Sequence, residues 1–286
     1  MEKESLFENS DNKLESALAS IMTAEEYSKI EHSTPHVFEL KSGDKELLYF
    51  GAPHTHDSNS SLFEKIESAF NKINPDVVFV EGVSVKGDKE VFEQQLKAAS
   101  SEEVIKRMGE GGFALKLAVD NAIDWICPEP DEEDLYKELI TRGFTKEQIF
   151  TWNVFRTLAQ YNRLKDKQGF KEYVEKFIDD FKQKTGWENF DYSCDCAIQS
   201  GEEILNKQID VENEPSASDF IDPIPWEEKK DKQTVLNTIG ENFSSFRDKE
   251  IVKNIASAMK TNQRIFIVYG ASHAVMQEPA LKKLIE

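Results

Sequence analysis

Two histidines of this chain follow two separate apolar runs at the same distance. The run "LLYFGAPH" ends in Gly51-Ala-Pro-His54, and the run "IFIVYGASH" ends in Gly270-Ala-Ser-His273. Such runs are typical of buried strands, and open α/β sheets bind ligands beyond the carboxyl ends of their strands. Glycine there lets the backbone turn sharply and a ligand approach closely. Because the motifs use two of the chain's five histidines, we expect them to share one site.

Two glutamates occupy comparable places. Glu81 closes the apolar run "VVFVEG" and is again followed by glycine. A carboxylate at the end of a buried strand is costly unless it is paired or faces a polar cleft, so a site residue, a salt bridge and a helix cap all stay open. Glu110 lies in "RMGEGGFALKLA", where a helix is predicted to begin. The helix dipole alone favours a carboxylate there, which gives Glu110 a structural alternative.

Four more polar residues adjoin these motifs. In an extended segment, His56 faces the same side as His54, and it is open to three interpretations: a second ligand, a proton shuttle or a rim residue. Asp57 can equally cap the helix that follows. Arg247 and Asp248 are expected to open a late helix, where Asp248 suits the N-terminus. Arg247 is either a surface charge or a partner for acidic residues or an anionic intermediate.

The order of these motifs resembles the TraB/TIKI superfamily, which includes GumN/PrgY-like proteins. The features that carry the resemblance are Gly51-x-x-His54, Glu81 after an apolar strand, "GEGGFALKLA", "FRD" at 246–248 and Gly270-x-x-His273. They lie within about 45–130 and 235–280, and the chain is more distantly similar to erythromycin esterase and ChaN-like proteins. The resemblance implies a metal-dependent hydrolase with a related α/β core. It further implies that His54 and His273 are the site histidines, with Glu81 and Glu110 as acidic partners and Arg247 as a supporting residue. We therefore expect His54, His273 and Glu81 to bind the metal and Glu81, Glu110 and Arg247 to serve catalysis. His56 is added as a catalytic candidate for its position alone, because the "HTHD" extension has no counterpart in the resemblance.

Imidazole nitrogens and carboxylate oxygens suit Mn²⁺, Co²⁺ or Zn²⁺. Such an ion polarises a carbonyl and activates water, so we expect hydrolysis of a peptide, amide or ester bond in a small-molecule or peptide substrate. A metal-independent alternative, similar to erythromycin esterase, has His54 activating a water held by Glu81 and Glu110. A third alternative is a non-enzymatic haem-binding, ligand-binding or regulatory protein.

The composition narrows the class of partner. The 286 residues include 54 acidic and 35 basic ones, a net charge of −19, which opposes binding to nucleic acid or to an anionic membrane. No apolar stretch approaches the roughly 20 residues of a membrane helix, and the N-terminus lacks the pattern of a signal peptide, so we expect a cytoplasmic protein. The three cysteines do not suggest a disulfide framework, and "CDC" at 194–196 is read as plain cysteines. Composition leaves the oligomeric state open.

The helices and strands that position the site are predicted from the spacing of apolar residues along the chain. Residues 1–35 predict a loose helical segment, and residues 36–51 predict a hairpin around "KSGD". A helix over 61–74, with Ser61 and Glu64 as a capping box, leads to a buried strand ending at Glu81. This order predicts a parallel pair of strands joined by a helix.

The rest of the chain alternates helix and strand around one insertion. A glycine-rich turn runs into a helix after residue 109, and a strand follows at about 123–128. The acidic "PEPDEED" at 128–134 is read as a strand end and helix start, and about 131–210 as a helical insertion. A late helix over 244–261 and a final strand complete one domain over 36–286. The predicted fold is therefore α/β, with a mixed, largely parallel central sheet flanked by helices.

Overall fold

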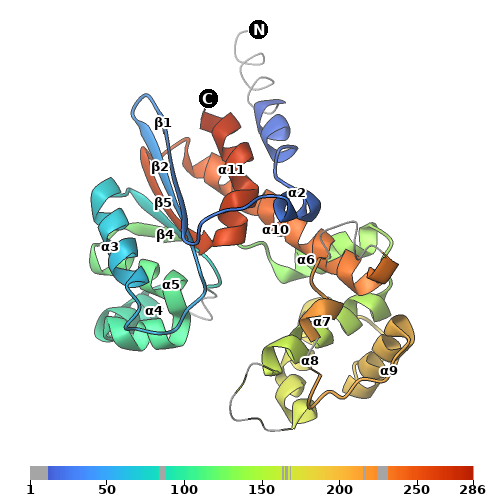
Figure 1. Cartoon of the computed structure of the whole chain (residues 1–286). Helices are drawn as coiled ribbons and strands as arrows, with labels where there is room; N and C mark the ends of the chain where they lie inside the picture. The colour runs from blue at the N-terminus through green and yellow to red at the C-terminus, as the bar shows by residue number, and fades with distance from the viewer. Residues whose placement is uncertain are drawn as a thin grey trace. The chain divides into compact units, whose positions relative to one another are not determined.

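A computed structural model of the chain describes residues 12–83, 88–162, 164, 167, 169–214, 217–223 and 231–285. They form two compact units (Figure 1). The first unit is Met1–Thr23, Lys29–Glu129 and Asp248–Glu286, and the second is Ala24–Ser28 and Pro130–Arg247. Of the predicted N-terminal segment 1–35, residues 1–11 lie outside the described part.

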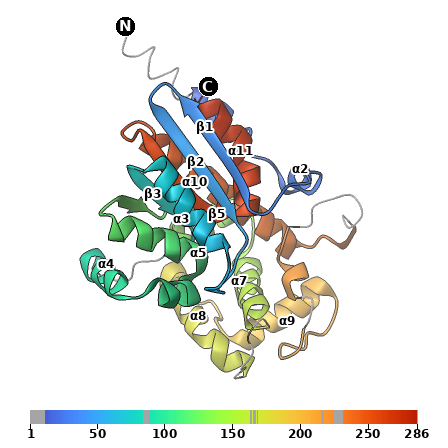
Figure 2. The same ribbon diagram turned by 60° about the vertical axis from the view of Figure 1, so that its left-hand side comes forward.

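The first unit is built on one mixed sheet. Among the described residues five strands pair in the order β1-β2-β5-β3-β4, and only β1 and β2 are antiparallel. Figure 2 shows the edge where these two strands pair. The predicted fold class, a largely parallel α/β sheet flanked by helices, is confirmed. The strand bounds are β1 His36–Ser42, β2 Lys45–Ala52, β3 Val77–Val80, β4 Asp124–Ile126 and β5 Arg264–Gly270.

Alternation along the central strands creates two apolar faces. Leu48 and Phe50 of β2 point to the face covered by α3, α4 and α5, whereas Leu47 and Tyr49 point to the opposite face. That opposite face is covered by the C-terminal part of α10, by α11 and by a helix over 12–18, and the helix layers are visible in Figure 1. The helix bounds are α3 Leu62–Ile73, α4 Lys89–Ala98, α5 Ser101–Asp120, α10 Val235–Ala258 and α11 Ala271–Ile285.

The predicted pairing of β2 with β3 is wrong in one respect. The two strands are parallel, but β5 lies between them and pairs with both. Its residues Arg264–Gly270 are buried almost throughout, as a central strand requires. The C-terminal strand therefore becomes the middle of the site-bearing sheet.

One predicted helix cap and one predicted helix start are also wrong. Ser61 precedes α3 but has helical backbone angles, φ −63° and ψ −5°, and its side chain makes no capping hydrogen bond. A capping side chain needs an extended backbone, so no capping box forms with Glu64. The late helix α10 begins at Val235 rather than near residue 244, because Leu236, Ile239 and Phe243 extend its buried face.

The second unit is helical in its described residues. Besides α2 (Ala24–Ser28) it contains α6 Glu132–Thr141, α7 Lys146–Tyr161, α8 Phe170–Thr185, α9 Cys194–Leu205 and a 3₁₀ turn, Ala217–Phe220. Its aromatic-rich core includes Phe150, Phe155 and Phe181. Helices therefore occupy the region predicted as an insertion at about 131–210, and the unit continues to Arg247.

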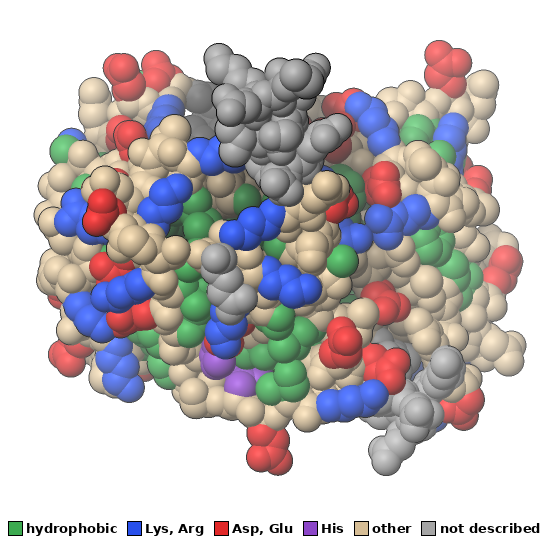
Figure 3. Space-filling view, turned by 90° about the horizontal axis from the view of Figure 1, so that it is seen from above, with side chains coloured by type: hydrophobic (Ala, Val, Ile, Leu, Met, Phe, Trp, Pro, Cys, Tyr) green, Lys and Arg blue, Asp and Glu red, His purple; other side chains and the backbone are tan. Residues whose placement is uncertain are grey.

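The surface carries charges of both signs. Figure 3 shows one face, on which Lys and Arg side chains lie around hydrophobic side chains near the middle. None of the described helices is both long and apolar enough to cross a membrane.

The three cysteines are all free thiols, and burial raises the pKa of Cys194 to about 11, so its thiol is not activated.

Candidate functional site

The ends of β2 and β5 bring the two Gly-x-x-His motifs to the same edge of the sheet. The strands are parallel, and Ala52 is opposite Gly270. His54 lies in the loop just after β2, and His273 lies in the first turn of α11. The two motifs thus extend from adjacent strand ends, as the sequence predicts for a ligand site.

Glu81 directly follows β3, the strand on the other side of β5 from β2. Its Oε2 atom accepts a hydrogen bond of 2.7 Å from the backbone N–H of Gly270. Its Oε1 atom is 3.6 Å from Nε2 of His273. Because β3 pairs with β5, the carboxylate reaches across to the end of the neighbouring strand. The predicted neighbourhood of Glu81 and His273 is therefore present.

His54 is held from the other side by Glu110. Its Nδ1 atom is 2.5 Å from Oε1 of Glu110, and the backbone N–H of Thr55 donates to Oε2 at 3.2 Å. Burial raises the pKa of Glu110, but the hydrogen bonds from His54 and Thr55 outweigh it and leave the pKa below its ordinary value. The carboxyl is therefore ionised at neutral pH.

Gly270 marks the space that His54 and Glu81 share. A methyl group added to Gly270 would lie 3.1 Å from Nε2 of His54 and 3.4 Å from Oε2 of Glu81. Nε2 of His54 and the Glu81 carboxylate therefore approach the same point of the backbone. The His54 side chain is 72% exposed, whereas those of Glu81 and His273 are 18% and 14% exposed. The site opens to solvent on the His54 side.

The glycines around Glu110 allow the close packing of α5. Gly109 has φ +61°, which breaks the helix into two segments, so Glu110 begins the second segment as predicted. A methyl group on Gly111 would lie 2.6 Å from the carbonyl oxygen of Glu81. The pattern "GEGG" therefore bends α5 towards the loop after β2 and packs it against the end of β3.

Asp248 is the site residue whose role the sequence prediction missed. It lies inside α10 rather than at its start, and its side chain is only 1% exposed. Its Oδ1 atom is 2.6 Å from Nδ1 of His273 and accepts a 2.7 Å bond from Nε2 of Gln277. The Tyr49 hydroxyl in turn donates to Gln277 Oε1 at 3.1 Å. This chain of contacts fixes the His273 ring from behind.

A periodicity signal for Asp248 exists in the sequence. Asp248, Ile251 and Ile255 are spaced by three and four residues, so they share one face of α10. Both isoleucines are fully buried. A carboxylate on that apolar stripe must meet a partner inside the protein. Gln277 and Tyr49 carry no comparable signal, because neither stands out from its surroundings in the sequence.

His56 and Asp57 follow His54 in the loop after β2. The His56 ring is 3.2 Å from the carbonyl oxygen of Ile105. Asp57 accepts hydrogen bonds from Asn59, which is a local turn rather than a cap of α3. Arg247 immediately precedes Asp248 along α10 but belongs to the second unit, so its role stays a prediction.

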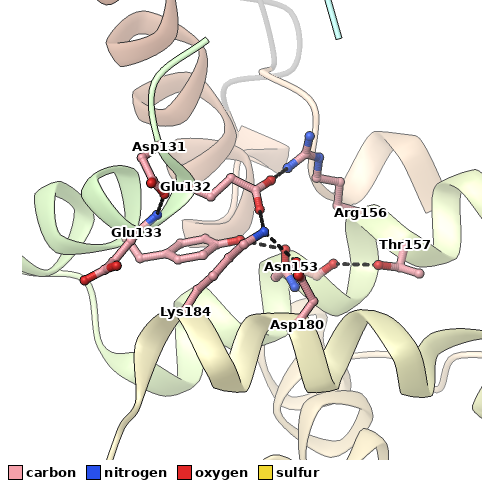
Figure 4. Close-up of polar contacts among 9 residues, drawn as sticks. Asp131, Glu132, Glu133, Asn153, Arg156, Thr157, Asp180 and Lys184 are labelled. Atoms are coloured by element: carbon pink, nitrogen blue, oxygen red, sulfur yellow. Dashed lines mark hydrogen bonds and ion pairs between the residues drawn. The ribbon is translucent and has the colours of Figure 1, made fainter. Parts of the chain in front are cut away.

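A separate polar cluster occupies the second unit (Figure 4). Asp131 caps α6, and the acidic residues of "PEPDEED" fill its first turn, as the sequence predicts. Lys184 donates to both Glu132 and Asp180, and Arg156 lies 3.6 Å from Glu132. These opposite charges pair α6, α7 and α8 with one another, so the acidic run is explained by packing.

The fold and the site define an α/β protein with a histidine–carboxylate centre at the strand ends. Comparison of the chain with protein-family models, with curated proteins and with solved structures gives no match. Within the described part of the chain, no group of three or more His, Cys, Asp or Glu side chains is arranged to hold a metal ion.

Proposed function

We propose that the first unit is a metal-dependent hydrolase of peptide, amide or ester bonds, acting on a small-molecule or peptide substrate at Glu81, His54 and His273. The observation that carries the proposal is the matched pairing of the two rings. Nδ1 of His54 faces Glu110, and Nδ1 of His273 faces Asp248. An ionised carboxylate only accepts hydrogen bonds, so each Nδ1 carries the hydrogen and each neutral ring keeps a lone pair on Nε2.

The donor types of this set suit a divalent cation, although the described side chains do not form a closed metal-binding group. Two imidazole nitrogens with lone pairs and one carboxylate are donors that Mn²⁺, Co²⁺ or Zn²⁺ accepts, and His54, His273 and Glu81 would hold the ion. A histidine that binds a metal through one ring nitrogen usually donates a hydrogen bond from the other, often to a carboxylate. Both rings face a carboxylate in this way here. A bound ion would polarise the scissile carbonyl and lower the pKa of a water molecule.

Each residue around the proposed ion has its own proposed role in the hydrolysis. Glu110 and Asp248 keep the two rings in one tautomer and one orientation. Glu81, anchored by the N–H of Gly270, accepts the proton of the attacking water as general base. Arg247 is proposed to stabilise the developing oxyanion, a role that rests on the family resemblance. His56 is proposed as a proton shuttle at the rim of the site.

A metal-independent hydrolase is the second candidate. The pair of Glu110 and His54 has the geometry of an oriented base, because the carboxylate holds Nδ1 and leaves Nε2 for the water proton. The exposed side of the site lies at His54, where a substrate has access. In this scheme Glu81 positions the water and no cation takes part.

A thermal-shift panel with Mn²⁺, Co²⁺ and Zn²⁺ separates the two candidates. An ion present at 100 times its Kd stabilises the native state by about 2.7 kcal/mol. For a chain of this size we expect a rise in Tm of roughly 4–5 °C for at least one cation in the wild type. The His273→Ala variant should lose the rise. His32→Ala is the matched control, since it removes an exposed histidine that is not among the proposed ligands.

Gly270→Ala supplies an independent variant that keeps every proposed ligand. Its methyl group would intrude between His54 and Glu81, so we expect a smaller metal-induced rise in Tm with little change in the metal-free Tm. If no cation at millimolar concentration raises the Tm of the wild type, the metal-dependent mechanism is wrong. Hydrolysis that survives chelation would then support the metal-independent candidate, and a haem absorption band without hydrolysis would support a binding protein.

A further inference from the structure

A cavity of the first unit lies where β2 begins, at the end of that strand remote from His54. Its volume is about 570 Å³, within the range typical of small-molecule sites. The turn between β1 and β2, the C-terminal end of α10 and the end of α11 contribute to its wall. All the residues that line it belong to the first unit.

The rim of this cavity is basic although the chain is strongly acidic. Four lysines line it, and no acidic residue does so within the described part of the chain: Lys13, Lys45, Lys253 and Lys260. Lys253 pairs with Glu250, and Lys45 donates to the backbone carbonyl of Met259. The ammonium groups of Lys13 and Lys260 have no partner among the described residues. In a chain of net charge −19, this gathering of lysines favours an anionic ligand at this position.

The floor of the cavity is apolar. Met259 and Ile285 are each only 8% exposed and belong to the core that covers one face of the sheet. Leu14 and Leu284 pack against the same core and complete the floor. Phosphate or another wholly polar anion would leave this surface unused.

We propose that the cavity binds an anionic amphiphile of the fatty-acid type. The carboxylate head lies between the unpaired ammonium groups of Lys13 and Lys260, and the alkyl chain lies over Met259 and Leu284. Each methylene buried on such a surface strengthens binding by about fourfold. The head needs a cationic partner because desolvating an unpaired carboxylate is unfavourable. The lysines therefore recognise the head of the ligand, and the apolar floor recognises its alkyl chain.

Titration calorimetry of the full chain with decanoate tests this proposal. We expect saturable binding to the wild type, with acetate and decan-1-ol each at least about tenfold weaker, since each lacks one of the two recognition elements. The double variant Lys13→Gln/Lys260→Gln should bind decanoate about tenfold more weakly or worse. The matched control, Lys65→Gln/Lys97→Gln, removes two exposed lysines from α3 and α4 and should bind as the wild type does.

Two further variants keep the result interpretable. Ala256→Phe places a ring in the cavity and should abolish binding while all four lysines remain. His273→Ala should bind decanoate normally, because the strand-end site is separate from this cavity. Equal affinity of the lysine double variant and the wild type would overturn the proposal. So would equal affinity for decan-1-ol and decanoate, for acetate and decanoate, or an absence of decanoate binding to the wild type.

Discussion

Removal of the buried carboxylate of Asp248 should destabilise the first unit strongly. The side chain is 1% exposed, and its Oδ1 atom accepts from both His273 and Gln277. Asp248→Ala leaves these two donors without an acceptor inside the protein. Each unsatisfied buried group costs about 1–3 kcal/mol, so the free energy of unfolding should fall by about 2–6 kcal/mol.

Asp248→Asn separates the hydrogen bonds from the charge. The amide oxygen keeps the shape and the position of the acceptor, but its bond to His273 is no longer charge-assisted, and such bonds are about half as strong. We expect a loss of about 1–2 kcal/mol, clearly below that of Asp248→Ala. The order of the two variants is therefore the sharper prediction.

Urea unfolding followed by circular dichroism measures both losses. A double-mutant cycle between Asp248→Ala and Gln277→Ala should show a coupling of about 0.5–3 kcal/mol, because the two side chains share one hydrogen bond. A loss below about 0.5 kcal/mol for Asp248→Ala would mean that the side chain is not a buried acceptor. Additivity of the two variants would refute the contact with Gln277 while leaving that with His273 open to the same test.

Two predictions concern the rest of the fold. The hydrogen bonds from Arg264, chiefly from its guanidinium, hold the pKa of Asp76 below its usual range. Its contribution to stability is therefore full above the unfolded-state pKa of about 3.9 and is lost as the pH falls through the lower folded value. Acid unfolding should show the stability gap between wild type and Asp76→Asn shrinking towards low pH, and a gap independent of pH would contradict this. In the second unit, a methyl group on Gly201 would lie 2.1 Å from the buried Phe155 ring, so Gly201→Ala should cost about 1–3 kcal/mol in urea unfolding. Gly169→Ala, whose methyl group meets no atom within 4 Å, is the control, and equal losses would refute the packing argument.

The strands and their ends were predictable because a buried strand appears in the sequence as a short apolar run. The run "VVFV" forms β3 with all four residues buried, β5 ends at the motif glycine Gly270, and β2 ends at Ala52, one residue after Gly51. Parallel strands place their carboxyl ends at one edge, so a repeated Gly-x-x-His pattern at two such ends already predicts neighbouring histidines. The same logic placed Glu81 next to them.

Helix starts were less predictable because a motif gives residue types but no backbone angles. Ser61 and Glu64 have the spacing of a capping box, yet Ser61 is already helical and cannot use its hydroxyl as a cap. The start of α10 was placed near residue 244, although the helix begins at Val235. A methyl group on Gly240 would lie 2.0 Å from the carbonyl oxygen of Ile221. Glycine is required for that contact, and the helix continues through it.

Because the start of α10 was misplaced, the role of Asp248 as a buried hydrogen-bond acceptor was missed. At a helix start a carboxylate needs no partner beyond the helix dipole, whereas inside a buried face it needs a hydrogen-bond donor. The donors come from α11, more than twenty residues further along the chain. No local pattern contains that contact, so only the three-dimensional arrangement assigns Asp248 to His273.

The position of β5 explains why the site depends on both ends of the first unit. β5 pairs with β2 on one side and with β3 on the other, so Gly270 at its end binds Glu81 and lies close to His54. Two of the proposed ligands, His54 and Glu81, follow β2 and β3, which do not pair with each other. Until β5 is inserted, Glu81 lacks its bond to Gly270, and His273 and Asp248 are absent from the site. Because these contacts are distant in sequence, their loop-closure entropy must be overcome before the centre forms. The proposed active centre is therefore a product of the completed sheet and not of its N-terminal half.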